Sequence, residues 1–550
     1  MKNSVLKVHP SDNIIVALAD LRKGDNIPLE NGACQLAEDI PLKHKFAERN
    51  FSVGEAVVMY GVTIGRAVRP VPAGTRISRE NVVHDAGKYQ LTAGTSAWSA
   101  PDTSRFSHRS FQGYARSGGK VGTRNYWLVI PLVFCENRNI KVLQAALLEP
   151  LGYLSERQFS VNTQQLIDAY RQGQQSQEAI MQAEILLDAT QVRQQRVFPN
   201  VDGVKFLTHD GGCGGTRQDS EALCRLIAGY ILNPNVAGAT VLSLGCQHAQ
   251  MQLLEEAIAS FDPGFDKPLY MLEQQKSKSE RDYIADAVKK TFSGLINANQ
   301  ACRQPFPLSK LVVGLECGGS DGLSGITANP ALGHASDLIA TLGGTTILSE
   351  FPELHGAEQD LINRCTEAAS AEKFVHLMEA YAAQAVATGS GFDMNPSPGN
   401  IRDGLITDAM KSAGAARKGG TSPVTDVLDY TEQARKPGLN LLCTPGNDVE
   451  STTALASSGT NLIVFTTGLG TPTGNPIAPT IKMSSNSILA RRMPDLIDID
   501  AGTIVEGNDS IASKGELLLE LMIEVASGRL TCAEQLGQDD FIPWKRGVSL

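Results

Sequence analysis

Apolar runs of strand length alternate with segments of helical spacing beyond residue 113, and this alternation constrains the fold more than any other feature of the sequence. The strand-like runs include WLVIPLVF, ATVLSLG, LVVGL and TTILSEF, and segments such as DSEALCRLIAGYIL and MQLLEEAIASF lie between them. Strands that alternate with helices in this way are typical of parallel α/β layers. We therefore predict an α/β body with parallel sheet layers.

The first 88 residues have a different pattern. Short runs such as NIIVALADL and AVVMYG are separated by Gly/Pro turns, which predicts a small all-β domain. A segment rich in Ser, Thr, Ala and Pro follows and is typical of a flexible linker, and a further unit starts near NPSPGN. The predicted division is an all-β domain at 1–88, a linker at 89–112, an α/β domain at 113–390 and a C-terminal α/β domain at 391–550.

One polar segment interrupts the alternation of strands and helices. Residues 155–196 are rich in Gln and have helical spacing without a strongly apolar face. We expect this segment to be an exposed helical insertion rather than a part of the active site.

The balance of charges excludes some classes of partner. Asp and Glu outnumber Lys and Arg by 59 to 49, and a chain with a formal net charge of -10 repels the phosphate backbone of nucleic acids. The N-terminal segment lacks the pattern of a secretory signal, and the longest apolar runs are too short to cross a membrane. We expect a cytoplasmic protein that binds neither nucleic acid nor membranes, and self-association into a homo-oligomer stays open.

Four turns with polar residues and glycines follow strand-like runs. They are THDGGCGGTRQD (208–219), LGCQHAQ (244–250), LECGGSDGLSG (315–325) and TPGNDVESTT (444–453). Ligands of parallel sheets collect beyond the carboxyl ends of the strands, and glycine lets a ligand approach the backbone. The alternative is that each turn is a tight connection in which Asp or Ser caps the next helix. Four turns of the same kind favour a binding site.

Three of these turns carry a cysteine, namely Cys213, Cys246 and Cys317. Thiolates from three separate loops can hold a metal ion or an iron–sulfur cluster, whereas thiols buried beside glycines are small apolar groups. The spacing of the cysteines does not distinguish a metal or cluster site from buried thiols. In the all-β domain, four residues offer imidazole or carboxylate ligands for Fe(II), Mn(II) or Zn(II): His9, His44, Glu80 and His84.

No nucleotide-binding signature is complete in this chain. GYARSGGK lacks the spacing of a phosphate-binding loop and a Ser or Thr after its Lys, and no G-x-G-x-x-G follows a suitable strand. Enzymes that use nicotinamide or ATP are therefore disfavoured.

Several motifs occur in the order found in one known family. They are HPSDNIIVAL, KHKFA, YGVTIGRAV, GYARSGGKVGTRN, LECGGSDGLSGITANP, NPSPGN, TPGND and TTGLGTPTGNPIAPTIKMSSN. In these motifs the chain resembles the altronate/galactarate dehydratase family. The resemblance implies an N-terminal SAF-type β-clip domain, a two-part body and a divalent metal, usually Fe(II), with Mn(II) as another candidate. It also implies a hydro-lyase that removes water from a sugar acid, most closely one that converts D-altronate to 2-dehydro-3-deoxy-D-gluconate.

The chain departs from the family pattern in three places. The segment ISREN has Ser78 and Glu80 where the family usually has histidines. The family glutamate of one turn is Gln247 here, and a lysine that often follows NPSPGN is Ile401, so a general base on that lysine is not expected. The ligands that remain for the metal implied by the resemblance are His9, His44 and Glu80.

Dehydration of a 2,3-dihydroxy acid removes a weakly acidic proton beside a carboxylate and expels hydroxide, so the site needs a base, an acid and a cation. The acid–base candidates in the predicted turns are His209, Glu316, Asp321 and Asp448. The candidates for hydrogen bonds to substrate hydroxyls are Ser320, Ser324, Asn395, Asn400 and Asn447. Three alternatives stay open: a dehydratase for galactarate or another aldonate or aldarate, an iron–sulfur lyase built on the cysteine turns, and a sensor that binds a sugar acid without reaction.

Overall fold

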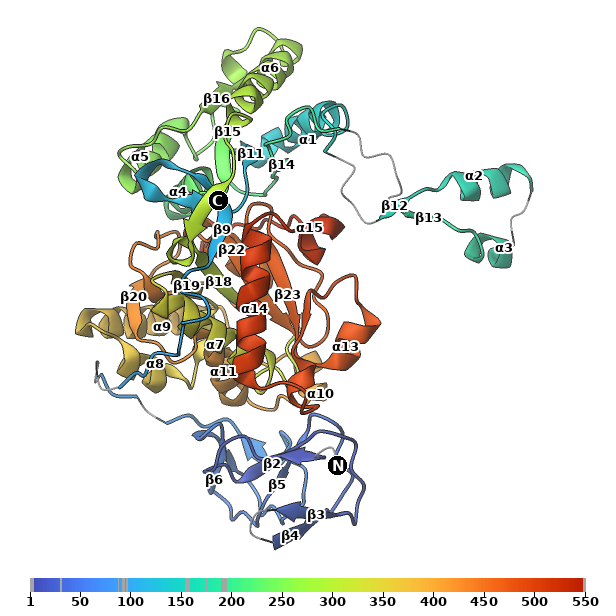
Figure 1. Cartoon of the computed structure of the whole chain (residues 1–550), viewed down its shortest axis with the longest axis vertical. Helices are drawn as coiled ribbons and strands as arrows, with labels where there is room; N and C mark the ends of the chain where they lie inside the picture. The colour runs from blue at the N-terminus through green and yellow to red at the C-terminus, as the bar shows by residue number, and fades with distance from the viewer. Residues whose placement is uncertain are drawn as a thin grey trace.

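The computed structural model describes residues 4–547 except 30–31, 88, 92–93, 95–96, 154–158, 174–175 and 189–194. Three regions follow one another along the long axis of the molecule (Figure 1). The N-terminal domain lies at one end, a four-stranded sheet lies at the other, and a seven-stranded sheet lies between them. Among the described residues, no helix combines the length and the apolar character that crossing a membrane requires.

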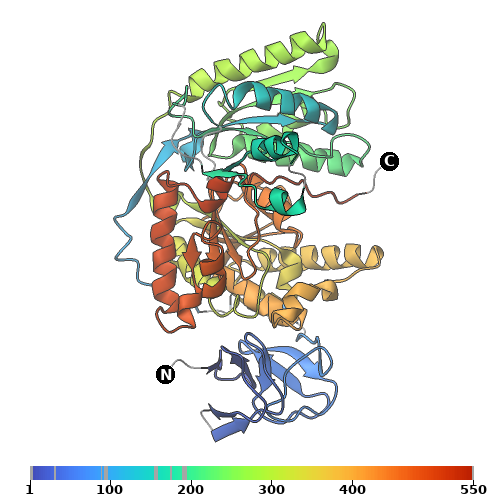
Figure 2. The same cartoon turned by 90° about the vertical axis from the view of Figure 1, so that its right-hand side faces the viewer.

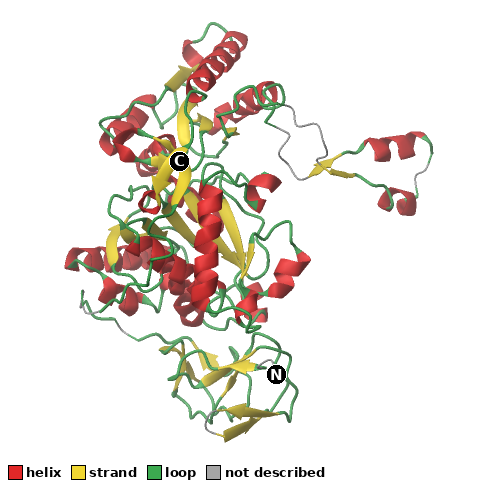
Figure 3. Ribbon diagram, in the orientation of Figure 1, coloured by secondary structure: helices red, strands yellow, loops and turns green. Residues whose placement is uncertain are grey.

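The N-terminal domain consists of short antiparallel strands, as the sequence predicts (Figure 3). Its small sheets have the orders β1-β2-β5, β3-β4 and β6-β7-β8. The strands are β1 (Val5–Leu6), β2 (Ile14–Ala17), β3 (Asn26–Leu29), β4 (Gly32–Gln35), β5 (Lys45–Ala47), β6 (Ala56–Met59), β7 (Val62–Ala67) and β8 (Val82–Val83). Part of its core is shared with the body, because Met59 and Ile64 belong to the same buried cluster as Ile406 and Met410.

The predicted linker has no helix or strand among its described residues before Ser110, where β9 (Ser110–Ala115) begins, and it contacts the body. The Tyr89 hydroxyl donates to Glu379 Oε1 (2.8 Å), and Trp98 Nε1 donates to Thr421 Oγ1 (3.2 Å). Phe106 is buried in the core of the body. The described part of this segment is therefore attached to the surface of the body.

The region after the linker is built on a four-stranded parallel sheet with the order β14-β11-β15-β16. β11 and β15 are buried along their whole length, which explains their continuous apolar sequence. The strands are β11 (Tyr126–Pro131), β14 (Gly203–Phe206), β15 (Val236–Ser243) and β16 (Leu269–Glu273), with helices α1 (Asn137–Leu147), α4 (Arg217–Leu232), α5 (Met251–Phe261) and α6 (Glu280–Ala298). A small antiparallel sheet of β9 (Ser110–Ala115), β10 (Val121–Gly122) and β17 (Gln304–Pro307) connects this region to its neighbour.

The Gln-rich segment extends away from the rest of the molecule in Figure 1. Its described part contains β12 (Phe159–Val161), α2 (Gln164–Arg171), α3 (Gln177–Met181) and β13 (Leu186–Asp188). β12 and β13 pair antiparallel, and most described side chains between them are exposed. The polar sequence thus builds two short helices on a pair of strands, while residues 155–158, 174–175 and 189–194 lie outside the described part.

The last region is built on a seven-stranded sheet with the order β20-β21-β19-β18-β22-β23-β24, in which all neighbours are parallel. This sheet confirms the predicted α/β body. Its strands are β18 (Val312–Cys317), β19 (Thr345–Leu348), β20 (Val424–Leu428), β21 (Gly438–Leu442), β22 (Leu462–Thr467), β23 (Thr480–Ser484) and β24 (Ile499–Asp500). Its helices are α7 (Ala328–Thr341), α8 (Glu358–Arg364), α9 (Ala368–Ala387), α10 (Pro398–Arg402), α11 (Asp408–Ala416), α12 (Asp448–Ser457), α13 (Ser487–Arg492), α14 (Ile511–Ala526) and α15 (Cys532–Leu536).

This sheet crosses the domain boundary that the sequence pattern placed at 390/391. β18 and β19 precede that boundary and β20 to β24 follow it, yet all of them pair in one sheet. Their buried side chains also belong to one core, which includes Leu315, Leu348 and Val464. The structural division therefore falls before β18. In Figure 2 the two sheets are seen as separate layers of the body.

Candidate active site

The carboxyl ends of the seven-stranded sheet border a cleft with a volume of about 860 Å³. In open parallel sheets, ligands bind where the strand order reverses, and here the order reverses between β18 and β22. Gly318 and Gly319 follow β18 and line the cleft, as does Leu469 after β22. Other walls come from α9, the start of α12 and the C-terminal residues 544–547. This position makes the cleft the candidate active site.

The glycines after β18 provide space for an acidic side chain. A Cβ atom at Gly318 would lie 2.0 Å from Asp448 Oδ2 and 2.5 Å from the ring of Phe465. Gly319 has a φ of +58°, and a Cβ there would lie 2.8 Å from Thr471 Oγ1. Only glycine fits both positions without a shift of the surroundings. The glycine-rich turn therefore serves the placement of Asp448 in the cleft.

We expect Gly318→Ala to lower kcat by about 10²-fold, because the added methyl group must displace the Asp448 carboxylate and small misplacements of a reacting group have effects of this size. Steady-state kinetics measure the change, and circular dichroism checks the fold. Gly399→Ala is the matched control, since a Cβ at Gly399 meets no atom closer than 3.7 Å. Equal kcat values in the two variants would contradict the role given to Gly318.

A buried charge cluster lies beside the cleft, and its members are Glu316, Cys317, Glu350, Glu353, Lys411 and Lys418. Lys418 Nζ lies 2.5 Å from Glu350 Oε2 and 2.9 Å from Cys317 Sγ. Lys411 Nζ lies 2.5 Å from Glu353 Oε1. Glu353 and Lys411 also line the cleft, so the cluster forms part of its wall.

The cluster carries two balanced pairs of charges. Burial and the neighbouring Glu350 raise the pKa of Glu316 well above its ordinary value. Burial raises the pKa of Glu350 as well, against the effect of Lys418. Burial opposes ionisation of Glu353, but Lys411 and Lys418 lower its pKa. Burial alone would lower the pKa of Lys418, yet Cys317 and the glutamates raise it well above its ordinary value.

Glu350 is held in an unusual backbone conformation. Its φ of 67° lies in the left-handed region, which non-glycine residues rarely adopt and which is enriched at functional sites. The Glu350 N–H donates to Thr444 Oγ1 (2.8 Å), at the end of β21. Glu316 is fixed in a similar way, because Ser349 Oγ (2.9 Å) and Ser451 Oγ (2.6 Å) donate to its Oε2. Residues that follow β19 and β21, together with a serine of α12, thus position both carboxyl groups.

Asp448 is the acid–base candidate that faces the cleft. It is half-buried at the start of α12, where Asn447 Oδ1 accepts hydrogen bonds from Val449 N and Glu450 N. Burial, followed by the charges of Glu350 and Glu353, raises the pKa of Asp448 from 3.8 to about 7. A carboxyl group that titrates near neutrality is able to take up and release a proton at working pH.

Asp321 occupies a different position from the one expected for an acid–base group. It is fully buried, and it does not line the cleft. Lys43 Nζ of the N-terminal domain lies 2.9 Å from Asp321 Oδ2. The other groups that donate to its carboxylate are Leu323 N, Ser324 Oγ, Ser485 Oγ and Asn486 Nδ2. With so many donors, Asp321 connects the turn after β18 to β23 and to the N-terminal domain.

The predicted substrate-binding residues divide into two groups. Asn395, Asn400 and Asn447 line the cleft. Asn395 Oδ1 accepts from Lys411 Nζ (2.8 Å), which places an amide beside the cation of the wall. Ser320 and Ser324 are buried next to Asp321 and do not line the cleft.

His209 lies far from this chemistry in the fold, after β14 of the four-stranded sheet. Both of its ring nitrogens already have partners: Nε2 donates to Pro131 O (2.7 Å), and Nδ1 accepts from Gly211 N (3.1 Å). Burial lowers the pKa of this imidazole, so it is neutral. His209 does not line the cleft, and its hydrogen bonds give it a structural role.

The structure does not bring together His9, His44 and Glu80. His9 Nδ1 is hydrogen-bonded to Ser11 Oγ (2.7 Å), and His44 Nε2 is hydrogen-bonded to Arg402 O (3.0 Å). Glu80 is exposed and pairs with an arginine of its own domain. The three residues follow different strands of the N-terminal domain, and none of them belongs to a group of ligand atoms within 4.8 Å of one another in the described part of the chain.

The three cysteines of the predicted cluster are also separate. Cys213 and Cys246 are exposed and follow strands of the four-stranded sheet, whereas Cys317 is buried at the end of β18. The described residues contain no group of close ligand atoms that includes Cys213 or Cys246. The turns belong to two different sheets, and the iron–sulfur cluster stays an alternative of the sequence analysis.

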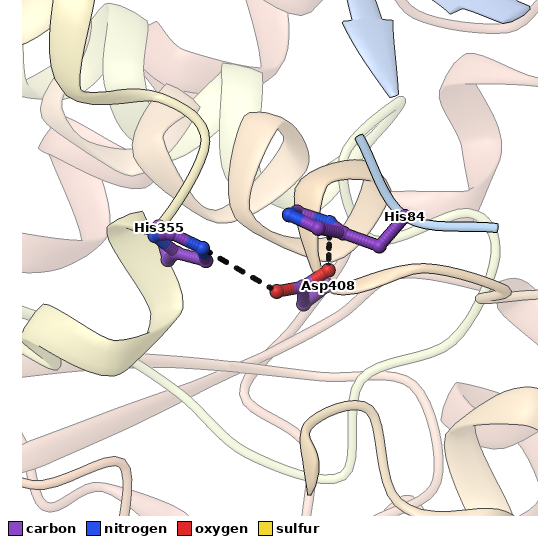
Figure 4. A group of neighbouring side chains, drawn as sticks. All are labelled: His84, His355 and Asp408. Carbon is purple, nitrogen blue, oxygen red and sulfur yellow. Dashed lines mark ion pairs between the residues drawn. The ribbon is translucent and has the colours of Figure 1, made fainter. Parts of the chain in front are cut away.

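Two other groups of potential ligands do meet within the described residues, with ligand atoms within 4.8 Å of one another. The first is Cys317, Glu350 and Glu353, but Lys411 and Lys418 already supply the positive charge there. A divalent cation does not fit where two ammonium groups already neutralise the carboxylates. The second is His84, His355 and Asp408, which Figure 4 shows.

Four residues of the charge cluster were not among the residues predicted from the sequence: Glu350, Glu353, Lys411 and Lys418. Glu350 is the last polar residue of the run TTILSEF and Glu353 follows the run, so both come after β19 and the rule applied to the other turns also covers them. The two lysines come from α11 and the residues after it, and no local motif marks them. Lys482 of β23 was missed as well: it is buried, its Nζ donates to Thr471 O (2.7 Å), and burial lowers its pKa to about 7.

A cleft with a near-neutral carboxyl group beside a lysine is the site of an acid–base enzyme, and comparisons with known proteins give its family. Three family models match: the altronate/galactarate dehydratase SAF domain at residues 3–85, the D-galactarate dehydratase/altronate hydrolase second domain at 113–299, and the D-galactarate/altronate dehydratase C-terminal domain at 308–549. The chain therefore belongs to the altronate/galactarate dehydratase family. It is a hydro-lyase that dehydrates a sugar acid.

Relatives match the chain along nearly its whole length. It is 33% identical to altronate dehydratase from Escherichia coli (strain K12) over 548 residues, which are 99% of both chains. It is 32% identical to altronate dehydratase from Bacillus subtilis (strain 168) over 550 residues, which are 100% of both chains. It is also 32% identical to galactarate dehydratase (L-threo-forming) from Escherichia coli (strain K12) over 538 residues, 97% of this chain and 94% of the relative.

Proposed function

We propose that this chain dehydrates D-altronate to 2-dehydro-3-deoxy-D-gluconate in the cleft at the carboxyl end of the seven-stranded sheet. The observation that carries the proposal is Asp448, a carboxyl group that faces the cleft and titrates near pH 7. The similarity to two altronate dehydratases over 99% or more of the chain supports the choice of substrate.

Polar groups around the cleft suit a polyhydroxy acid. Arg546 lines the cleft. The guanidinium group of Arg546, which also pairs with Asp429 (2.7 Å), places a positive charge at the cleft that attracts the substrate carboxylate. Asn395, Asn400 and Asn447 supply further donors and acceptors for the hydroxyl groups.

In the proposed reaction, the ionised Asp448 takes the proton from C2, next to the substrate carboxylate. The electron pair of the C2–H bond forms the C2–C3 double bond, and the C3–O bond breaks. Protonated Asp448 then delivers its proton to the departing hydroxide, which leaves as water. The enol product becomes the 2-keto acid by transfer of its hydroxyl proton to C3.

Lys411 stabilises the negative charge that develops on the substrate. Its ammonium group lines the cleft, and the charge of Glu353 raises its pKa in spite of burial, so it stays protonated. A fixed cation beside a developing oxyanion is worth more in a cleft wall than in water. Fe(II) or Mn(II), which the family resemblance implies, does not fit the charge cluster in the wall of the cleft, so no step of the proposed reaction depends on it. The proton transfers described above need only Asp448 and the substrate.

Purified enzyme supplied with Fe(II) should convert D-altronate to a 2-keto-3-deoxy acid faster than it converts galactarate, because of the similarity to altronate dehydratases. The measurement is kcat/KM for a panel of hexonates and hexarates, with the 2-keto product detected by semicarbazide. Boiled enzyme and a chelator-treated sample are the controls. A higher kcat/KM for galactarate would contradict the proposal and favour the second candidate, a galactarate dehydratase.

A further inference from the structure

His84, His355 and Asp408 meet where the N-terminal domain contacts the body (Figure 4). His84 follows β8 of the N-terminal domain. His355 follows the short 3-10 helix η5 (Phe351–Leu354) of the body, and Asp408 is the first residue of α11. Segments far apart in the sequence therefore bring two imidazoles and one carboxylate to a single point.

The ligand atoms of this group face one another. His84 Nδ1 contacts Asp408 Oδ1 directly. His355 Nε2 lies 3.9 Å from Asp408 Oδ2. The two imidazole rings are nearly parallel, with an angle of 27° between them and 5.3 Å between their centres. The nitrogen and oxygen atoms are thus close enough to bind one ion without a change of the backbone.

Asp408 carries an unsatisfied buried oxygen. Its side chain is only 3% exposed, and its Oδ2 has no hydrogen-bond partner among the described residues. Its Oδ1 accepts from Ala409 N (3.0 Å), so one oxygen is anchored while the other points at His355. A buried carboxylate oxygen without a partner is unfavourable, and a ligand at this point removes the penalty.

A second carboxylate orients His355 for metal binding. Glu358 Oε1 lies 3.0 Å from His355 Nδ1, and Glu358 Oε2 accepts from Gly356 N (2.6 Å). When Nδ1 donates its proton to Glu358, Nε2 is left with its lone pair toward Asp408. This arrangement of carboxylate, imidazole and metal is the usual surrounding of a histidine ligand.

We propose that His84, His355 and Asp408 bind a divalent first-row transition metal ion at the junction between the N-terminal domain and the body. Two imidazoles and one carboxylate suit Mn(II), Fe(II) or Zn(II), whereas Mg(II) and Ca(II) prefer oxygen ligands alone. The side chains of His84 and His355 are 28% and 37% exposed, so solvent reaches the site and water completes the coordination.

This ion connects the N-terminal domain to the elements that form the active site. Asp408 and Lys411 share the first turn of α11, and Lys411 lines the cleft. Glu353 lies in η5, just before His355, and also lines the cleft. None of the three ligands lines the cleft itself, so the ion fixes the position of the wall and does not contact the substrate. The site is independent of which sugar acid the enzyme dehydrates.

The test is the binding of Mn(II) to full-length protein that has been treated with a chelator. The electron paramagnetic resonance signal of free Mn(II) gives the number of ions bound per chain. We expect His355→Ala and Asp408→Asn to bind one ion fewer than the wild type. We also expect Mn(II) to raise the Tm of the wild type but not that of Asp408→Asn.

Two further variants sharpen the result. Glu358→Gln keeps the ligands and should weaken Mn(II) binding by about 10–100-fold, the usual effect of losing a partner of a histidine ligand. His44→Ala is the matched control, because His44 is a histidine at the same junction whose Nε2 is bound to Arg402 O. It should keep the full number of ions.

Equal numbers of bound ions in the wild type, His355→Ala and Asp408→Asn would overturn the proposal. Loss of the ion in His44→Ala instead would also overturn it, and would place the metal on the ligands that the family resemblance implies. If the ligand variants fail to fold, Glu358→Gln decides, and unchanged Mn(II) affinity in that variant counts against the site.

Discussion

Asp448→Asn should lower kcat by about 10²-fold or more, because the amide has nearly the same shape as the carboxyl group but cannot take the C2 proton. In the wild type, kcat/KM should rise with pH and level off above about 7, where Asp448 is ionised. In Asp448→Asn this rise should disappear. Steady-state rates with D-altronate between pH 5 and 9 measure both effects, at a constant concentration of divalent metal.

The stability of Asp448→Asn separates a catalytic role from a structural one. In the folded wild type the pKa of Asp448 is about 7 instead of 3.8, so the folded state binds more protons than the unfolded state between these values. The free energy of unfolding of the wild type therefore falls as pH rises through this interval. It does not fall in this way in Asp448→Asn, because Asn carries no charge. At pH 8 the Tm of Asp448→Asn should equal or exceed that of the wild type. A large decrease in Tm together with a normal kcat would mean that Asp448 stabilises the first turn of α12 and does not take part in the reaction.

Lys418→Met should destabilise the body by about 3–5 kcal/mol, because it leaves the carboxylate of Glu350 buried without its cation. Lys418 and Glu350 are 1% and 0% exposed, so water cannot replace the lost partner. A loss of this size corresponds to a decrease in Tm of about 10 °C in a region of a few hundred residues. Thermal unfolding followed by circular dichroism measures the change.

A surface lysine provides the control for this prediction. Lys436 lies 3.5 Å from Glu367, and the two side chains are 44% and 59% exposed. Lys436→Met should change stability by no more than about 0.5 kcal/mol. Addition of Glu350→Gln to Lys418→Met should restore part of the lost stability, because the unpaired charge is then absent. Equal Tm values for Lys418→Met and Lys436→Met would show that the buried pair does not stabilise the fold.

The seven strands of the main sheet illustrate what the local sequence predicts. β18, β19 and β22 are buried, and their apolar runs predict a parallel sheet correctly. The local sequence does not predict which strands are neighbours in the sheet. For example, β18 pairs with β22 across many intervening residues. No local pattern encodes such a pair. For this reason the sequence pattern predicts a domain boundary at 390/391, although one sheet crosses it.

The same contrast holds for the site. The rule that ligands collect after strands is sufficient to place Asp448 and Asn447 at the cleft, because the carboxyl ends of parallel strands always share one edge. The rule cannot distinguish Asp448 from Asp321, since both follow strands. Tertiary contacts decide, because five donors surround Asp321, whereas burial beside Glu350 and Glu353 raises the pKa of Asp448.

The sequence by itself determined the types of secondary structure, the all-β domain and the edge of the sheet that bears the cleft, since each depends on residues close together in the chain. Only the tertiary structure decided which charges meet. Lys418 with Glu350, and His84 with His355 and Asp408, come from separate elements. Whether such groups form ion pairs, share a metal or remain apart depends on distances of a few ångströms and on exclusion of water, which exist only after the chain has folded.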